Sequence, residues 1–398
     1  MIQKDILKNL CRFIERALYK KLIKKHRMIK EKGKMKILFI TNVPSPYRVD
    51  FFNELGKYCD LTVLFEKNTS DERDESWKNY IFKNFKGIIL NGKKLSTDTA
   101  FCPEILKYVT NRSFDKVICT IFTDLTGMLA IQTMKILGIP YYLECDGGFA
   151  KSGRGFREKI KKRMITGARG YFSTGISCDE YYLMYGAEKN RLMRYPFSSI
   201  FNIDIHNEIM NEEEKKYLKN ELGIKEERLI LTVGQFIHRK GFDVLLEAAK
   251  KLPSDIGIYF VGGRPTKDYL ELQNGLTNVH FEGYKQKDEL AKYYKVADVF
   301  VLPTREDIWG LVIQEAMAYG LPIISTDKCA AALEVVKENE NGYIVPVEDS
   351  YAIEKRIEDI FKSKRKIQEF RNKSLEIIKS YTIEKMVECH LKYFKEGD

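Results

Sequence analysis

Short apolar runs alternate with amphipathic stretches along most of this chain, and this alternation limits its possible folds more than any other feature. Runs of strand length occur in the first half at 35–40, 61–65, 88–90, 116–121, 140–144 and 170–174. They recur in the second half at 229–233, 256–261, 280–281, 298–302, 322–325 and 342–345. Helical spacing of apolar residues separates many of them, as at 124–137, 241–251, 266–273, 287–295 and 310–319. Strands that alternate with helices predict an α/β fold with mainly parallel sheets.

The alternation loosens once, near the middle of the chain, and then starts again. A chain of 398 residues is long enough for two domains, each with its own core. We therefore expect an N-terminal α/β domain at 35–198, a linker at 199–211 and a C-terminal α/β domain at 212–382. The closing amphipathic helix, at about 383–398, could pack on either domain.

The positive charge of the chain is concentrated at its N-terminus. The formal net charge is +11, and residues 1–34 contain twelve Lys or Arg against three acids, so this leader carries +9 and the rest only +2. The basic balance therefore does not indicate a nucleic-acid-binding body. Residues 2–23 have the pattern of a basic amphipathic helix, which can lie on an anionic membrane surface. The helix could also pack on its own protein, or the natural start could be Met35, directly before the first strand.

Cysteine and histidine usage argues against disulfides and structural metal sites. The eight cysteines are scattered without any C-x-x-C pair, and the five histidines form no cluster with them. No apolar run approaches the ~18 residues that a membrane-spanning helix needs, and no secretory signal is evident. We expect a cytoplasmic protein without a metal, peripheral on the inner face of the plasma membrane if the leader binds lipid.

The segment 304–322 is the most informative about function. It follows the apolar run 299–303 and places two acids, Glu306 and Asp307, before a helix that contains Glu315. A strand, an acidic turn and a helix N-terminus, in that order, describe a ligand site at the carboxyl edge of a parallel sheet. The helix N-terminus suits a phosphate, and the carboxylates suit hydroxyl groups, so a nucleotide sugar would fit. The competing interpretation is a capped amphipathic helix with incidental acids.

Two further turns of the second half each follow a predicted strand, so both can lie at the same edge of the sheet. The run at 229–233 leads into Gly234 and a basic turn with Arg239 and Lys240, where cations can hold a diphosphate. Gly283 and Tyr284 follow another strand, where backbone groups could read a base edge. Each turn alone could be an ordinary solvated loop, but all belong to one predicted domain and can share one rim.

The first half offers two candidate turns. The segment 42–48 is stiffened by two prolines and presents Ser45 and Arg48 at the carboxyl edge of the sheet. Asp146 is expected to be exposed at the end of another strand, before two glycines, where an acid could contact sugar hydroxyls. A rigid turn and a plain Asp-Gly turn are the alternative interpretations.

Taken together, these motifs resemble the retaining glycosyltransferases of the GT-B fold in glycosyltransferase family 4, over roughly 35–395. The family's E-x7-E element, with its F/W-G and its E-A-M-A-x-G-x-P tail, is matched by Asp307-x7-Glu315, Trp309-Gly310 and 315–322. The phosphate turn V-G-x-x-x-x-x-K-G is matched at 233–241, and E-V-V…N-G-Y-I-V-P at 334–346. The run P-S-P-Y-R-V-x-F-F-N-x-L at 44–55 resembles the subset that builds bacterial surface polysaccharides. The resemblance implies two Rossmann-like domains that face each other across a cleft.

The resemblance also implies roles for individual residues. Glu315 would bind the ribose hydroxyls, Asp307 the donor sugar and Lys240 the diphosphate. The implied donor-binding set is Gly234, Arg239, Lys240, Gly283, Tyr284, Glu306, Asp307, Trp309, Gly310, Leu311, Val312 and Glu315. The implied catalytic set is Asp146, Asp307 and Lys240, with Ser45 and Arg48 on the acceptor side.

Three positions depart from the family pattern. Asp307 replaces the first Glu of the pair, and Glu306 beside it competes for the sugar contact. The usual Arg after the first glycine of the phosphate turn is Gln235, for which Arg239 could substitute. A histidine common in the N-terminal active site has no counterpart, and Asp146 stands nearest to it.

The expected function is transfer of a sugar, of the hexosyltransferase type, from a nucleotide diphosphate sugar to a hydroxyl of a glycan or lipid-linked glycan. No cofactor or metal is expected, because protein cations would replace Mg²⁺ at the diphosphate. The alternatives are a nucleotide-sugar epimerase on the same scaffold and a non-catalytic binding protein recruited to membranes by residues 1–34. A nicotinamide-dependent oxidoreductase would need G-x-G-x-x-G after the first strand, and 41–46 contains no glycine.

Overall fold

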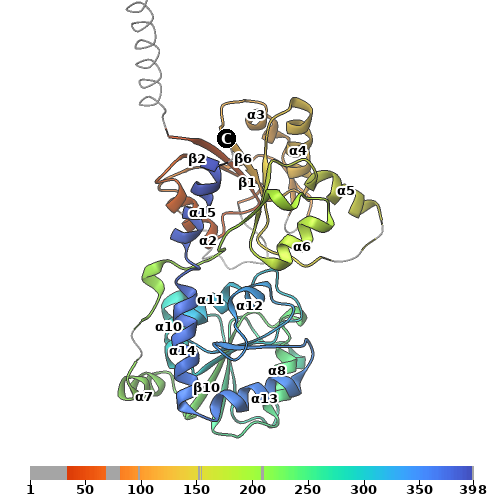
Figure 1. Ribbon diagram of the computed structural model, residues 1–398. Helices are drawn as coiled ribbons and strands as arrows, with labels where there is room; N and C mark the ends of the chain where they lie inside the picture. Colours follow the sequence, from red (N-terminus) through yellow and green to blue (C-terminus); the bar gives the residue numbers. More distant parts are fainter. Residues whose placement is uncertain are drawn as a thin grey trace, which may run out of the picture.

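The computed structural model describes residues 34–68, 81–96, 99–150, 153, 155–207 and 210–396, which form two α/β domains in sequence (Figure 1). The helix predicted at 2–23, and its membrane contact, lie outside the described residues.

The N-terminal domain is built on a seven-stranded sheet in the order β3-β2-β1-β6-β7-β8-β9. Every pair of neighbouring strands is parallel. The strands are β1 (Lys36–Thr41), β2 (Asp60–Phe65), β3 (Lys86–Ile89), β6 (Lys116–Cys119), β7 (Tyr142–Glu144), β8 (Gly170–Ser173) and β9 (Leu192–Arg194). The sequence predicted the first six; β9 lacks an apolar run because it is a short, partly exposed edge strand. A small hairpin, β4 (Lys93–Lys94) with β5 (Ala100–Phe101), was also not predicted.

The C-terminal domain has a six-stranded parallel sheet in the order β12-β11-β10-β13-β14-β15. Its strands are β10 (Arg228–Val233), β11 (Ile256–Val261), β12 (Val279–Glu282), β13 (Val299–Leu302), β14 (Ile323–Thr326) and β15 (Gly342–Val345). All six were predicted, most of them because a strand buried on both faces reads as a continuous apolar run, whereas β12 is mostly half-buried.

Helices connect the strands on both faces of each sheet (Figure 1). Those of the first domain are α2 (Pro46–Leu55), α3 (Leu106–Val109), α4 (Leu125–Leu137), α5 (Phe156–Ile165) and α6 (Ile176–Met184). Those that follow are α7 (Glu212–Glu221), α8 (Phe242–Ala249), α9 (Lys267–Gln273), α10 (Lys287–Val296), α11 (Leu311–Ala318), α12 (Ala330–Val335), α13 (Ser350–Phe361), α14 (Lys364–Ile378) and α15 (Ile383–Glu396). The confirmed α/β alternation therefore extends to α3, α5, α12, α13 and α14, which the sequence analysis did not assign.

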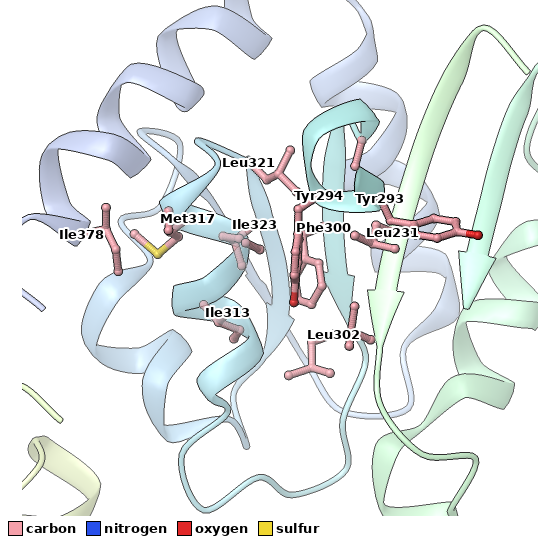
Figure 2. Packing of buried hydrophobic residues seen from close by; sticks show 14 of the residues in the cluster. Leu231, Tyr293, Tyr294, Phe300, Leu302, Ile313, Met317, Leu321, Ile323 and Ile378 are labelled. Atoms are coloured by element: carbon pink, nitrogen blue, oxygen red, sulfur yellow. The ribbon is translucent and has the colours of Figure 1, made fainter. Parts of the chain in front are cut away.

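The helix α11 is fixed by the core beneath it (Figure 2). Its Ile313 and Met317 are fully buried in one cluster with Leu302 of β13 and Leu231 of β10. Burying each such side chain contributes about 1.5–3 kcal/mol. The acidic turn before α11 is therefore anchored on one side by a buried strand and on the other by a buried helix.

The last helix, α15, returns to the N-terminal domain, which is one of the two placements that the sequence left open. Figure 1 shows it beside α2. Its His390 stacks on Phe172 of β8 with ring centroids 4.5 Å apart and planes inclined by 7°. The chain thus crosses between the domains twice, once after β9 and once between α14 and α15.

Candidate functional site

The turns singled out in the second half lie together at the carboxyl edge of the C-terminal sheet. The strand order reverses between β10 and β13, and such a reversal opens a crevice at the carboxyl ends of the strands. The basic turn follows β10 and the acidic turn follows β13, so both border that crevice.

The basic and acidic turns are hydrogen-bonded to each other. The backbone N–H of Arg305 and the hydroxyl of Thr304 both donate to the carbonyl of Arg239, at 2.8 and 2.9 Å. The close packing of the two turns requires glycine at position 241. Its φ is +65°, and a Cβ there would lie 2.1 Å from the carbonyl oxygen of Pro303. Gly241 thus allows the two turns to form one rim.

Lys240 and Asp307 meet across this rim. Lys240 Nζ lies 2.6 Å from Asp307 Oδ2, and both side chains are about seven-eighths buried. Arg239 Nη1 lies 3.5 Å from Asp307 Oδ1 and donates to the carbonyl of Glu306 at 2.8 Å. The cations that the resemblance assigns to the diphosphate therefore surround the acid that it assigns to the sugar.

The N-terminus of α11 completes the rim. Gly310, at φ +100°, precedes the helix, and no side chain caps it. The first N–H groups of a helix have no intrahelical partner and favour an anion, so Leu311 and Val312 can offer donors to a phosphate. Gly310 is required here because a Cβ would lie 2.6 Å from the Cys329 sulfur.

Trp309 lies behind the rim rather than on it. It is 4% exposed and packs edge-on against Phe197, with centroids 5.7 Å apart. Its carbonyl accepts from the Ala331 N–H at 2.8 Å. The ring of Trp309 therefore supports the turn from within the protein, and its place in the donor-binding set stays a prediction.

Glu315 is held by two hydroxyl groups that the sequence analysis did not identify. Its Oε1 accepts from Ser199 at 3.3 Å and its Oε2 from Tyr294 at 3.2 Å. Burial raises the pKa of Glu315 above its ordinary value, while the two hydroxyls oppose that rise. Ser199 belongs to the segment predicted as a linker, so no local pattern connected it with α11.

The remaining donor-side positions occupy the same edge of the sheet. Gly234 follows β10 directly and its N–H donates to the Val261 carbonyl at 3.0 Å. Gly283 and Tyr284 follow β12, and Tyr284 is half exposed. The predicted donor turns after β10, β12 and β13 are therefore assembled along one edge.

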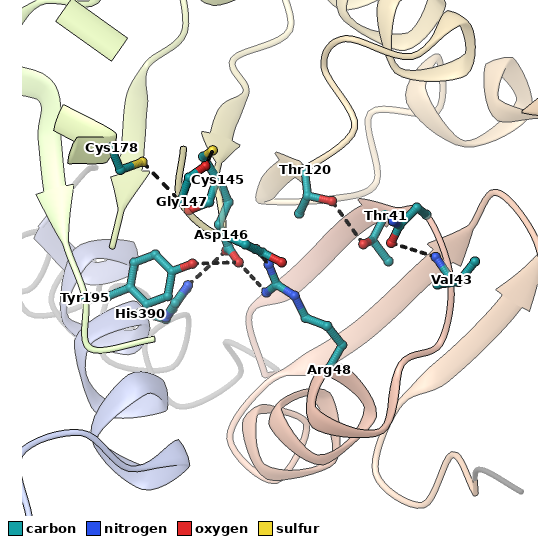
Figure 3. A network of polar contacts seen from close by, with 12 residues as sticks. Thr41, Val43, Arg48, Thr120, Cys145, Asp146, Gly147, Cys178, Tyr195 and His390 are labelled. Carbon is teal, nitrogen blue, oxygen red and sulfur yellow. Dashed lines mark hydrogen bonds and ion pairs between the residues drawn. The ribbon is translucent and has the colours of Figure 1, made fainter. Parts of the chain in front are cut away.

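The N-terminal domain contributes a buried charge network at the end of β7 (Figure 3). The Arg48 guanidinium forms ion pairs with both Glu144 and Asp146. Burial works against the charge of Arg48, but the two carboxylates outweigh it and raise its pKa. Burial raises the pKa of Asp146, and Glu144 adds to the rise while Arg48 opposes it.

The last helix, α15, adds His390 to this network (Figure 3). His390 Nε2 lies 3.1 Å from Glu144 Oε2, and the Tyr195 hydroxyl donates to Glu144 Oε1 at 3.3 Å. Burial alone would raise the pKa of Glu144, but Arg48 and His390 more than offset it and lower the pKa to about 2. The sequence analysis read His390 only as part of an apolar helix face and Glu144 only as part of a strand.

Two expectations for this half need correction. Ser45 and Arg48 lie at the carboxyl edge as predicted but are 3% and 2% exposed, so Arg48 faces the carboxylates and not an open surface. Asp146 was expected to be exposed, yet only a third of its side chain is, because Arg48 holds it. The acceptor-side roles of Ser45 and Arg48 stay predictions.

The loops of the two domains touch at the site. Gly147 lies so close to the acidic turn that a Cβ would be 1.9 Å from the Ile308 carbonyl oxygen. Gln314 Nε2 donates to the Phe197 carbonyl at 2.8 Å. On α12, Glu334 accepts from the first N–H of α6, that of Ile176, at 2.5 Å. These contacts bring the Asp146 loop against the Asp307 turn.

No described helix is long and apolar enough to cross a bilayer. No group of three or more His, Cys, Asp or Glu that could hold a metal ion occurs within the described ranges.

Residues 214–376, which include the basic and acidic turns, match the family described as "Glycosyl transferases group 1". This match lies within the C-terminal domain and covers less than half of the chain. The chain is 27% identical over 228 residues to an uncharacterized glycosyltransferase of Haemophilus influenzae, covering 55% of this chain and 62% of that protein. It is 30% identical over 136 residues to the lipopolysaccharide core biosynthesis glycosyltransferase LpsE of Rhizobium meliloti, covering 33% and 39%. Each of these alignments spans less than two thirds of the relative.

Solved structures match this chain over nearly its whole length. HepE of Anabaena in complex with UDP superposes with a TM-score of 0.76 at 15% identity, covering 91% of this chain and all of that one. Sucrose-phosphate synthase of Thermosynechococcus elongatus gives 0.70 at 18% identity, covering 91% and 98%. Together with the two facing parallel sheets, these likenesses show that the fold is GT-B, as expected.

Proposed function

We propose that this chain is a retaining glycosyltransferase of glycosyltransferase family 4. It moves a sugar from a nucleotide diphosphate sugar to a hydroxyl of a glycan or lipid-linked glycan in surface-polysaccharide biosynthesis. The observation that carries the proposal is the single rim formed by Lys240, Arg239, Asp307 and the uncapped start of α11. The similarity to LpsE, a lipopolysaccharide core biosynthesis enzyme, supports the polysaccharide assignment.

The donor is proposed to change the pairing on this rim. A diphosphate attracts Lys240 and Arg239 more strongly than one carboxylate does, because it carries more charge and accepts more hydrogen bonds. Asp307 would then be free to accept hydrogen bonds from sugar hydroxyls. Glu306, whose backbone carbonyl is fixed by Arg239, is the competing sugar contact.

Glu315 is proposed to accept hydrogen bonds from the ribose. Ser199 and Tyr294 set the direction of its two oxygens before any ligand arrives. Tyr284, on the half-exposed turn after β12, would flank the base. The HepE structures in complex with UDP and with UDP-glucose favour a uridine nucleotide as the first donor to test.

In the proposed reaction the bond between the anomeric carbon and the diphosphate oxygen breaks, and the diphosphate keeps the electron pair. Lys240, Arg239 and the α11 N-terminus stabilise that negative charge, which is where electrostatic catalysis contributes most. The acceptor hydroxyl bonds to the same face of that carbon, and its proton passes to the departing diphosphate on that face. Asp146, one third exposed beside the rim, would orient sugar hydroxyls.

A two-stage experiment tests the proposal. Thermal shifts with UDP-, GDP- and ADP-sugars identify the donor, because a bound ligand raises the melting temperature. Turnover is then followed with wild type, Glu315→Ala and Glu271→Ala, the last replacing a carboxylate on α9 whose side chain is 67% exposed. Only Glu315→Ala should lose donor binding and transfer. Full activity of that variant would remove the donor-site assignment.

The same assay separates the rival functions. An epimerase would convert the donor sugar without any acceptor, whereas a binding protein would bind the donor without releasing nucleotide. Residues 1–34 are proposed to bring the protein to an anionic membrane. Equal flotation with anionic liposomes, with and without that segment, would reject that part.

A further inference from the structure

A cavity lies in the C-terminal domain, away from the donor rim. It encloses about 790 Å³ and borders the start of β10, which is the edge of the sheet opposite to the carboxyl ends. Helices α7 and α14 supply half of its lining residues. Its volume lies within the ~300–1,000 Å³ that is usual for small-molecule sites.

Cations dominate the lining of this cavity. Eight Lys or Arg line it against four acids, and these charged residues are Lys215, Lys216, Lys219, Lys225, Arg228, Lys295, Lys364, Arg371, Glu212, Glu226, Glu227 and Asp298. Two of the acids are already engaged. Asp298 pairs with Lys215 and accepts the Leu229 N–H at 2.9 Å, and Glu226 accepts from the Tyr259 hydroxyl at 3.1 Å.

Arg371 is the unusual member of the wall. It is 9% exposed, and its Nε is buried without a hydrogen-bond partner. Its guanidinium forms no ion pair or hydrogen bond with any residue that the structure describes. Leaving the buried Nε–H donor of a charged group without a hydrogen bond costs free energy.

The charged neighbours of Arg371 only partly compensate for its burial. Burial lowers the pKa of Arg371, and the attraction of Asp298 and Glu212 only partly opposes it. Lys219, also 9% exposed, donates to the carbonyls of Glu226 and Glu227 at 3.2 and 2.6 Å, and so adds a second buried cation to the wall. An anion entering the cavity would satisfy Arg371 and balance the excess positive charge.

We propose that this cavity binds a small molecule carrying a phosphate group, with Arg371 as its central ligand. A guanidinium presents paired donors that match phosphate oxygens, and several lysines around it suit a dianion. The site is separate from the donor rim, because it lies at the amino edge of the sheet. Binding here would act on the enzyme from a second position rather than compete with the nucleotide sugar.

Calorimetric titration with inorganic pyrophosphate tests the proposal. The full chain is first saturated with UDP, or carries Lys240→Met, so that the diphosphate position of the donor rim does not contribute. Arg371→Met should weaken the remaining binding by about tenfold or more, the loss of one charge-assisted hydrogen bond. It should also keep or raise the melting temperature, because it removes an unpaired buried charge.

A matched control and a second variant keep the outcome clear. Lys373→Met, two positions along α14 and not in the cavity wall, should bind pyrophosphate as wild type does. If Arg371→Met does not fold, the double change Lys216→Met and Lys364→Met should still weaken binding severalfold. Pyrophosphate binding that is absent in the wild type, or unchanged in these cavity variants, overturns the proposal. Tighter binding of citrate than of pyrophosphate would overturn the phosphate assignment.

Discussion

The contact between Gly147 and the acidic turn makes a sharp prediction, because the two neighbouring glycines differ in one respect. Gly147 has a φ of +134° and Gly148 a φ of +146°, so both have a backbone conformation that L-residues rarely adopt. A Cβ at Gly147 would lie 1.9 Å from the Ile308 carbonyl oxygen, whereas a Cβ at Gly148 would have nothing within 4 Å. Alanine at either position therefore adds similar strain, but only Gly147→Ala adds a collision between the domains.

The size of the displacement follows from the distances. An ordinary contact begins at 3.4 Å, so Gly147→Ala must move the Asp146 loop away from the 306–310 turn by 1.5 Å, the difference between 3.4 and 1.9 Å. A misplacement of about 1 Å costs on the order of 10²-fold in rate when reacting groups must be held in place. The backbone strain itself costs about 1–3 kcal/mol of stability in each variant.

The assay compares kcat for sugar transfer, donor Kd and melting temperature in the two variants. We expect kcat of Gly147→Ala to fall about 10²-fold below that of Gly148→Ala, with similar melting temperatures. Donor Kd should stay near that of the wild type in both, because the donor turns belong to the C-terminal domain. Equal kcat values for the two variants would refute the reasoning that this contact sets the alignment of Asp146 with the donor.

Three further predictions concern the rim, the charge network and the role of metal. Gly241→Ala should lower the melting temperature well below that of Gly223→Ala, since a Cβ at Gly241 lies 2.1 Å from the Pro303 oxygen while Gly223, at φ +72°, has open space. Glu144→Gln should cost about 3 kcal/mol of unfolding free energy at pH 7, because the pKa of Glu144 is lowered from 4.5 to about 2. That stability is present above pH 4.5 and is lost as pH falls toward 2. The free energy of unfolding from urea denaturation should therefore fall less steeply with acid in the variant than in the wild type. An equal fall in both proteins would contradict this prediction. Sugar transfer should persist in EDTA but fall about 10²-fold or more in Lys240→Met. Loss of activity in EDTA would mean that a metal ion, and not Lys240, neutralises the diphosphate.

The sequence by itself determined the order of elements and the local chemistry of the donor turns. Apolar runs such as 256–261 predict strands because a strand buried on both faces must be apolar throughout. The spacing from Asp307 to Glu315 places one acid before a helix and one within it, whatever the rest of the fold does. Strand order did not follow from the sequence, and β9 was missed because a short, partly exposed edge strand carries a weak pattern. The helices α13 and α14 do carry an amphipathic pattern, which the sequence analysis did not assign.

Only the tertiary structure decided which groups are brought together at the site. Arg48 and Glu144 are 96 positions apart, Ser199 and Glu315 are 116 apart, and Glu144 and His390 are 246 apart. No local periodicity encodes such pairs, because they arise where separate elements pack and a buried charge must find a partner. The same holds for the 1.9 Å approach of Gly147 to Ile308, since this need for glycine comes from another domain and adds to the one set by its own positive φ.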